Sequence, residues 1–178
     1  DRTWMWSNDG SIRFADNKDG EIVEAWRTPS YNGFAKETKC DVVPVSSNNV
    51  PVTEHEKFSA VNVITTPGGA KVLDFGQNIA GYISFAVTAE KGQKIKLRFG
   101  EMFDENGEFT QKNIQCANKK RTRVTPLQQI EYYCKDGANE YKTKFAIFGF
   151  QYALIETDVE WKPEDFTAVA VYSDMEET

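Results

Sequence analysis

Alternation of polar and apolar residues over short segments is the feature that most constrains the fold. In residues 94–99 the Lys and Arg side chains alternate with Ile, Leu and Phe. Successive side chains of an extended strand point to opposite faces, so a period of two indicates a half-buried β-strand. Residues 82–88 alternate in the same way, and a turn that contains Gly92 follows them. We therefore expect these two segments to form a hairpin.

Further segments carry the same β signal. They are rich in β-branched and aromatic residues and are bounded by Gly, Pro, Asn or Asp. These segments are 58–65, 70–75, 128–134, 150–157 and 166–172. An Asn-Gly pair at residues 106–107 predicts another hairpin. No segment shows the period of an amphipathic helix, so the sequence predicts an all-β fold, an antiparallel, jelly-roll-like β-sandwich with little or no helix.

The N-terminal part of the chain has a different composition. Residues 11–14 and 21–26 are expected to form strands around an Asp- and Gly-containing turn, and a stretch rich in Pro, Ser, Asn and Thr follows. We therefore divide the chain into residues 1–53, the tail of a preceding β domain plus a linker, and a sandwich domain at residues 54–178. The alternative is that the first strands complete the sandwich. Because the chain begins with Asp, we expect either that a leader was removed or that the chain is part of a longer protein.

Composition excludes several classes of function. The formal net charge of -6 argues against a nucleic-acid partner, and the basic run 119–123 is expected to be solvated surface. No apolar run approaches the roughly 20 residues of a membrane-spanning helix. The single histidine, His55, lies among carboxylates and is expected to be solvated, which leaves no basis for a histidine metal site. The compartment, cytoplasmic or secreted, stays open.

Three cysteines are too few and too widely spaced for a disulfide scaffold or a zinc site. They are Cys40, Cys116 and Cys134. We expect all three to be reduced, and a bridge between Cys116 and Cys134 is the alternative. No cysteine has the basic surroundings that activate a thiolate.

The N-terminal turn is dense in oxygen ligands. Asp16, Asp19 and Glu21 could each offer a carboxylate to calcium, which takes six to eight oxygen ligands. The spacing is not that of an EF-hand, because the bidentate Glu at the twelfth position and the flanking helices are missing. A hydrated hairpin turn without metal is the alternative, so no cofactor is required and calcium is the one candidate.

Several peptides in order identify a family. They are Val72–Tyr82, Leu97–Glu101, Phe145–Tyr152 and Val171–Glu176. Together they resemble the β-sandwich domain that precedes the catalytic barrel of bacterial α-L-rhamnosidases, glycoside hydrolase family 78. The resemblance covers about residues 50–178. Residues 6–27 look like the tail of that family's N-terminal, carbohydrate-binding-like domain.

The resemblance implies a non-catalytic accessory domain of an enzyme that hydrolyses terminal α-L-rhamnose from glycosides. The family's catalytic carboxylates lie in an (α/α)6 barrel, which is the implied partner of this domain in the full-length bacterial chain. None of that barrel's motifs matches here, so no catalytic residue is assigned. The alternatives are a free-standing rhamnose-binding module, with or without calcium, and a structural or interaction domain that binds no sugar.

A sugar-binding surface needs an exposed aromatic face and a few amides or carboxylates. The candidate residues for carbohydrate contact are Trp26, Asp74, Gln77, Asn78 and Glu101. The alternative for each tryptophan is a place in the core. The alternative for Asp74, Gln77 and Asn78 is that they satisfy backbone groups at a bend that Gly76 and Gly81 permit.

Overall fold

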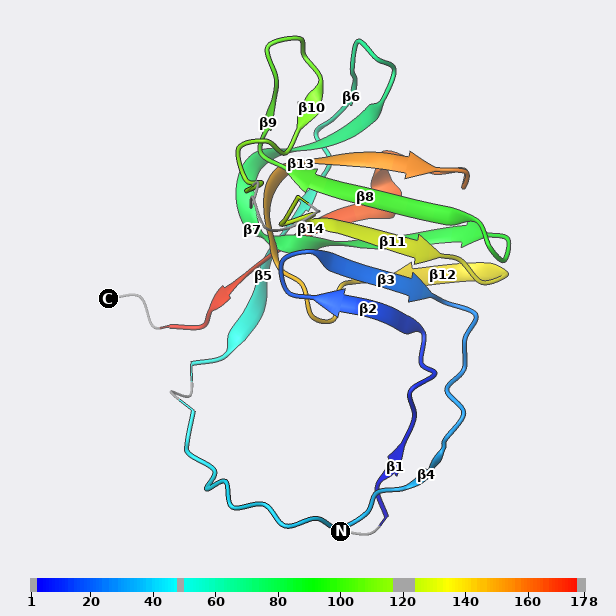
Figure 1. Cartoon of the computed structure of the whole chain (residues 1–178). Coiled ribbons are helices and arrows are strands. Elements are labelled where there is room, and N and C mark those ends of the chain that lie inside the picture. The colour runs from blue at the N-terminus through cyan, green and yellow to red at the C-terminus, as the bar shows by residue number, and fades with distance from the viewer. Residues whose placement is uncertain (1–2, 48–49, 117–123, 176–178) are drawn as a thin grey trace.

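The chain folds into a β-sandwich with a projecting N-terminal ribbon (Figure 1). The structure is a computed structural model and describes residues 3–47, 50–116 and 124–175. Its elements are β1 (Met5–Trp6), β2 (Ile12–Asp16), β3 (Gly20–Glu24), β4 (Gly33–Phe34), β5 (Val52–Ser59), β6 (Asn62–Thr65), β7 (Lys71–Ala89), β8 (Lys94–Gly100), β9 (Met102–Phe103), β10 (Phe109–Thr110), β11 (Gln129–Tyr133), β12 (Gly137–Tyr141), β13 (Phe148–Thr157), the 3-10 helix η1 (Pro163–Asp165) and β14 (Phe166–Ser173). No helix in this part of the chain is long and apolar enough to cross a membrane.

One curled, ten-stranded sheet makes both layers of the sandwich. Its strand order is β2-β3-β11-β8-β13-β7-β14-β5, with β6 and β12 also paired to β7. The pairing of β3 with β11 is parallel, and the other pairings in this sheet are antiparallel. The all-β sandwich predicted from the alternation is therefore confirmed, with one parallel pair within it.

The curl comes from β7, which is 19 residues long and belongs to both layers. Its first residues pair with β6 and the end of β13, and its later residues pair with β14 and β12. Between these two groups of residues, the pairing of β7 with β13 shifts register. Gly76 lies in this stretch and has a φ of +80°, a backbone conformation that favours glycine. The Asp74 carboxylate accepts the Gly76 N–H at 2.8 Å and so fixes this bend.

The core lies between the two layers. Its largest fully buried side chains include Phe99, Phe148 and Phe150. The Phe99 ring stacks on Phe148 at 4.4 Å between centroids and meets Phe150 edge to face at 5.0 Å. Each such ring contributes about 1.5–3 kcal/mol of burial free energy. The alternating residues of β8 supply Ile95 and Leu97 to the same cluster.

Three sequence predictions about the strands are wrong, because strand pairing depends on contacts between residues that are distant in the sequence. Residues 82–88 and 94–99 do not form a hairpin, because β8 pairs with β11 and β13 while β7 carries the chain into the other layer. Residues 70–75 and 82–88 belong to one strand, β7. Residues 58–65 are divided between β5 and β6, because β5 pairs with β14 and β6 pairs with β7. The hairpin predicted at residues 106–107 is confirmed by the pairing of β9 with β10.

The N-terminal residues take part in two different structures. Strands β2 and β3 form a hairpin that extends the main sheet at β11. Strands β1 and β4 form a separate two-stranded ribbon, on which the exposed fraction is 67% for Trp4 and 49% for Trp6. The division of the chain at residue 53 stays a prediction.

An ion-pair cluster on β8 and β11 predicts a loss of stability in acid. Glu131 lies 3.0 Å from the Lys94 Nζ and 3.5 Å from the Lys96 Nζ. Burial alone would raise the pKa of Glu131, but the hydrogen bonds and charges of the two lysines outweigh it and lower this pKa below its ordinary value. The cluster therefore stabilises the fold above the unfolded-state pKa of about 4.3, and this contribution disappears as the pH falls through the folded-state pKa.

We expect the change Glu131→Gln to remove this pH dependence. Between pH 7 and pH 3 the wild-type chain should lose up to about 1 kcal/mol more free energy of unfolding than the variant. Urea titrations at the two pH values measure the difference. Glu105→Gln, on the exposed turn after β9, is the control and should leave the pH dependence unchanged.

Candidate functional site

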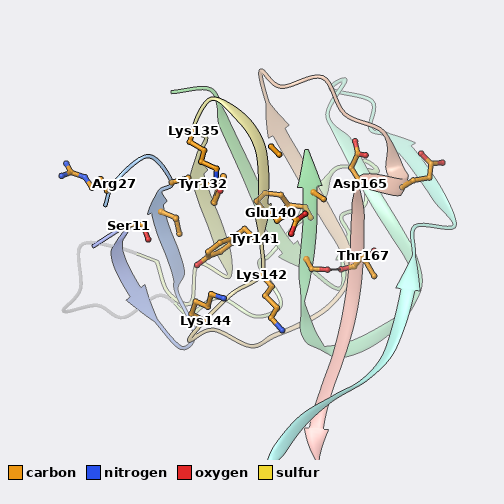
Figure 2. Close-up of a pocket in the computed structure, with 17 residues that line it drawn as sticks. Ser11, Arg27, Tyr132, Lys135, Glu140, Tyr141, Lys142, Lys144, Asp165 and Thr167 are labelled. Atoms are coloured by element: carbon orange, nitrogen blue, oxygen red, sulfur yellow. Dashed lines mark hydrogen bonds between the residues drawn. The ribbon is translucent and has the colours of Figure 1, made fainter. Parts of the chain in front are cut away.

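A large hollow lies beside the short strand β12 (Figure 2). It has a volume of about 930 Å³ and is lined from β3, β7, β11, β12 and β14. Tyr132 and Tyr141 lie in its middle, Lys142 and Lys144 lie along one side, and Asp165 lies at the far end beyond Glu140. The hollow therefore brings together aromatic rings and charges of both signs.

The two tyrosines of this hollow are held neutral. The Tyr132 hydroxyl donates to Asn139 at 3.2 Å, and the Tyr141 hydroxyl donates to Glu21. Burial raises the pKa of Tyr132 to about 12, and burial together with the Glu21 carboxylate raises the pKa of Tyr141 further. Neither hydroxyl can act as an acid or base near neutral pH. The described residues that line the hollow include no histidine and no cysteine, but they include the carboxylates Glu140, Glu164 and Asp165.

The predicted calcium ligands point into the protein or cap the turn. Asp16 accepts the backbone N–H groups of Lys18 and Asp19, each at 2.8 Å. Asp19 is 3% exposed and accepts the Thr125 hydroxyl at 2.7 Å. A calcium ion would have to displace such donors, and the described residues contain no group of three or more candidate metal ligands. Calcium binding stays a prediction.

Glu21 is the most fully engaged of these carboxylates. Its side chain is buried, and its Oε1 accepts the backbone N–H groups of Lys144, Phe145 and Ala146 at 2.8, 2.6 and 3.1 Å. The Tyr141 hydroxyl donates to the other oxygen. One side chain of β3 thus fixes the loop between β12 and β13, which sequence reasoning missed because the loop is 123 residues or more away in the chain.

Two of the residues predicted for carbohydrate contact lie together. Asn78 donates to Glu101 at 3.2 Å, and Asn113, which the sequence did not single out, donates to the other Glu101 oxygen at 2.9 Å. Asp74 lies on the opposite side of β13, where it also accepts the Gln151 amide at 3.0 Å. The structure therefore shows an exposed amide and carboxylate cluster at the bend of β7.

Trp26 is separated from this cluster by the length of β8. Its ring meets Tyr133 edge to face at 6.4 Å, and Tyr133 is paired with Lys94 at the start of β8. Glu101 follows the other end of that strand, roughly 20 Å away for a strand of 7 residues. The five predicted residues do not form one site. Sugar binding by any of these residues stays a prediction.

The sequence led us to expect a solvated His55, but the structure shows a different arrangement. Its ring is half-buried and stacks on Tyr172 with 3.5 Å between centroids and 6° between planes. The Tyr172 hydroxyl donates to Glu56 at 2.9 Å. Sequence reasoning had no signal for this contact, because the paired residues come from opposite ends of the sandwich sequence.

The cysteines are free. Cys40 and Cys116 are exposed, and Cys134 is buried, so the bridge between Cys116 and Cys134 is not formed. Burial raises the pKa of the Cys134 thiol to about 11, which makes it unreactive. The basic run predicted at residues 119–123 lies outside the described residues.

The curled sheet, with the hollow beside β12, forms an all-β sandwich domain. The chain belongs to the family of bacterial alpha-L-rhamnosidase concanavalin-like domains, whose model matches residues 64–172.

Known proteins agree with this assignment. The chain is 31% identical to an alpha-L-rhamnosidase of Formosa agariphila, over 100% of this chain and 20% of that protein. Its fold is similar to the crystal structure of native alfa-L-rhamnosidase from Aspergillus terreus, with a TM-score of 0.77 and 25% identity over 95% of this chain and 20% of the other. The alpha-L-rhamnosidase from Dictyoglumus thermophilum gives a TM-score of 0.71 and 25% identity over 92% of this chain and 19% of the other. The chain therefore spans about a fifth of the length of these relatives.

Proposed function

We propose that the chain is a non-catalytic accessory domain of an α-L-rhamnosidase, an enzyme that hydrolyses terminal α-L-rhamnose from glycosides. The observation that carries the proposal is the family match over residues 64–172 within relatives about five times as long.

The partner in this proposal is the catalytic (α/α)6 barrel of the same polypeptide. The sandwich would support that barrel as a rigid neighbour, since its two layers share the continuous strands β7 and β13. We also propose that β2 and β3 complete the sandwich, because β3 pairs with β11, β2 pairs with β3, and Glu21 fixes β3 to the loop before β13. Hydrolysis of an aryl α-L-rhamnoside, measured on this chain and on its parent enzyme, tests the proposal: only the parent should turn over substrate.

A further inference from the structure

A second, smaller groove lies where β5 and β14 extend past the bend of β7. Its volume is about 380 Å³, within the range of pockets that bind small molecules. We call it the end groove. Among the residues that line it are Glu56, Phe58, Gln77, Ile79, Ala170 and Tyr172. Only Gln77 was among the residues that the sequence singled out for carbohydrate contact.

One side of the end groove is apolar. Phe58 and Ile79 are half-buried and pack against the main core, so their positions are fixed by the sandwich. Tyr172 is 44% exposed, and its ring is held in place by the stacked His55. An aromatic ring and aliphatic side chains in a fixed arrangement are the surface on which the C–H face of a sugar ring packs.

Polar side chains that line the same groove supply hydrogen-bonding groups. Gln77 is exposed and offers both a donor and an acceptor through its amide. The Glu56 carboxylate accepts the Tyr172 hydroxyl with one oxygen, Oε1, at 2.9 Å. A backbone hydrogen bond and the Tyr172 hydroxyl lower the pKa of Glu56, so it remains an ionised acceptor for sugar hydroxyls at neutral pH.

We propose that the end groove binds a single sugar unit of the 6-deoxyhexose class. The methyl group of such a sugar lies against the apolar side made by Phe58 and Ile79, and its ring hydroxyls bond to Gln77 and Glu56. The choice of this sugar class rests in part on the proposed function, but the site itself rests on the groove. The binding test uses this chain alone, so a negative result leaves the accessory role standing. An inactive parent enzyme would likewise leave sugar binding standing.

The test is an NMR titration of the isotope-labelled 178-residue chain with L-rhamnose. We expect the Gln77 side-chain amide and the Ile79 methyl groups to shift, with a Kd of about 1–10 mM, as expected for so small a ligand. L-mannose differs only by a hydroxyl in place of a hydrogen on the methyl carbon. That hydroxyl would lie unpaired against the apolar side, so we expect binding about tenfold weaker.

Two variants test whether rhamnose binds in the end groove and not elsewhere on the surface. Tyr172→Ala and Gln77→Ala should each weaken rhamnose binding at least about fivefold, whereas Tyr31→Ala, at an exposed tyrosine of the N-terminal segment, should not. Gln77 is exposed, so its variant keeps the test informative if Tyr172→Ala impairs folding. No shifts at 50 mM rhamnose, or shifts confined to the cluster at Glu101, would overturn the proposal. Equal binding of L-mannose would overturn the placement of the methyl group.

Discussion

Replacing Glu21 with alanine should lower the free energy of unfolding by about 3–5 kcal/mol, because several donors share this buried carboxylate as their acceptor. The three backbone N–H groups of Lys144, Phe145 and Ala146 would be left without their acceptor, and so would the Tyr141 hydroxyl. The free energy of unfolding of a native protein is usually about 5–15 kcal/mol, so the variant would lose a large part of its stability.

Urea unfolding of the variant measures this effect. Glu21→Gln keeps the size and one acceptor oxygen and should fall between wild type and Glu21→Ala. Glu140→Ala, at an exposed position of the neighbouring strand β12, is the control and should change the free energy by no more than about 0.5 kcal/mol. A Glu21→Ala variant as stable as this control would show that the carboxylate does not hold β3 to the loop.

Replacing Gly81 with alanine should cost about 3 kcal/mol or more. A Cβ at this position would lie 2.0 Å from the backbone oxygen of Val169, where β7 and β14 run side by side. The nearby atoms belong to the backbone, so the strands would have to separate and lose ladder hydrogen bonds. The destabilisation would affect β7, the strand that joins the two layers.

The matched control for this change is Gly10→Ala, where a Cβ would meet no atom within 4 Å. Thermal and urea unfolding should show a large loss for Gly81→Ala and almost none for Gly10→Ala. If the two variants were equally stable, the close approach of β7 to β14 would be contradicted.

The alternating segments could be predicted from sequence because a period of two is a local signal. Residues 94–99 became β8 with Ile95 and Leu97 in the core, as their alternation indicated. The hairpin at residues 106–107 depended only on local turn chemistry and was also predicted correctly. Local patterns thus identified most strands and the all-β class.

Pairing partners could not be predicted because they depend on contacts between distant residues. The bend at Gly76 carries β7 from one layer to the other, and no local pattern distinguishes this from two separate strands. The acidic turn that ends at Glu21 looked solvated or metal-binding, yet its carboxylate is buried by a loop more than 120 residues away. The stacking of His55 on Tyr172 could not be predicted either, because the two residues are distant in the sequence.

The most direct test of the central claim is hydrolysis of an aryl α-L-rhamnoside by the 178-residue chain beside its parent enzyme. An accessory domain predicts turnover by the parent and none above background by the chain, although circular dichroism shows the chain to be folded. Turnover by the chain that is lost when one of its own carboxylates, such as Glu101 or Asp165, is replaced would contradict the account.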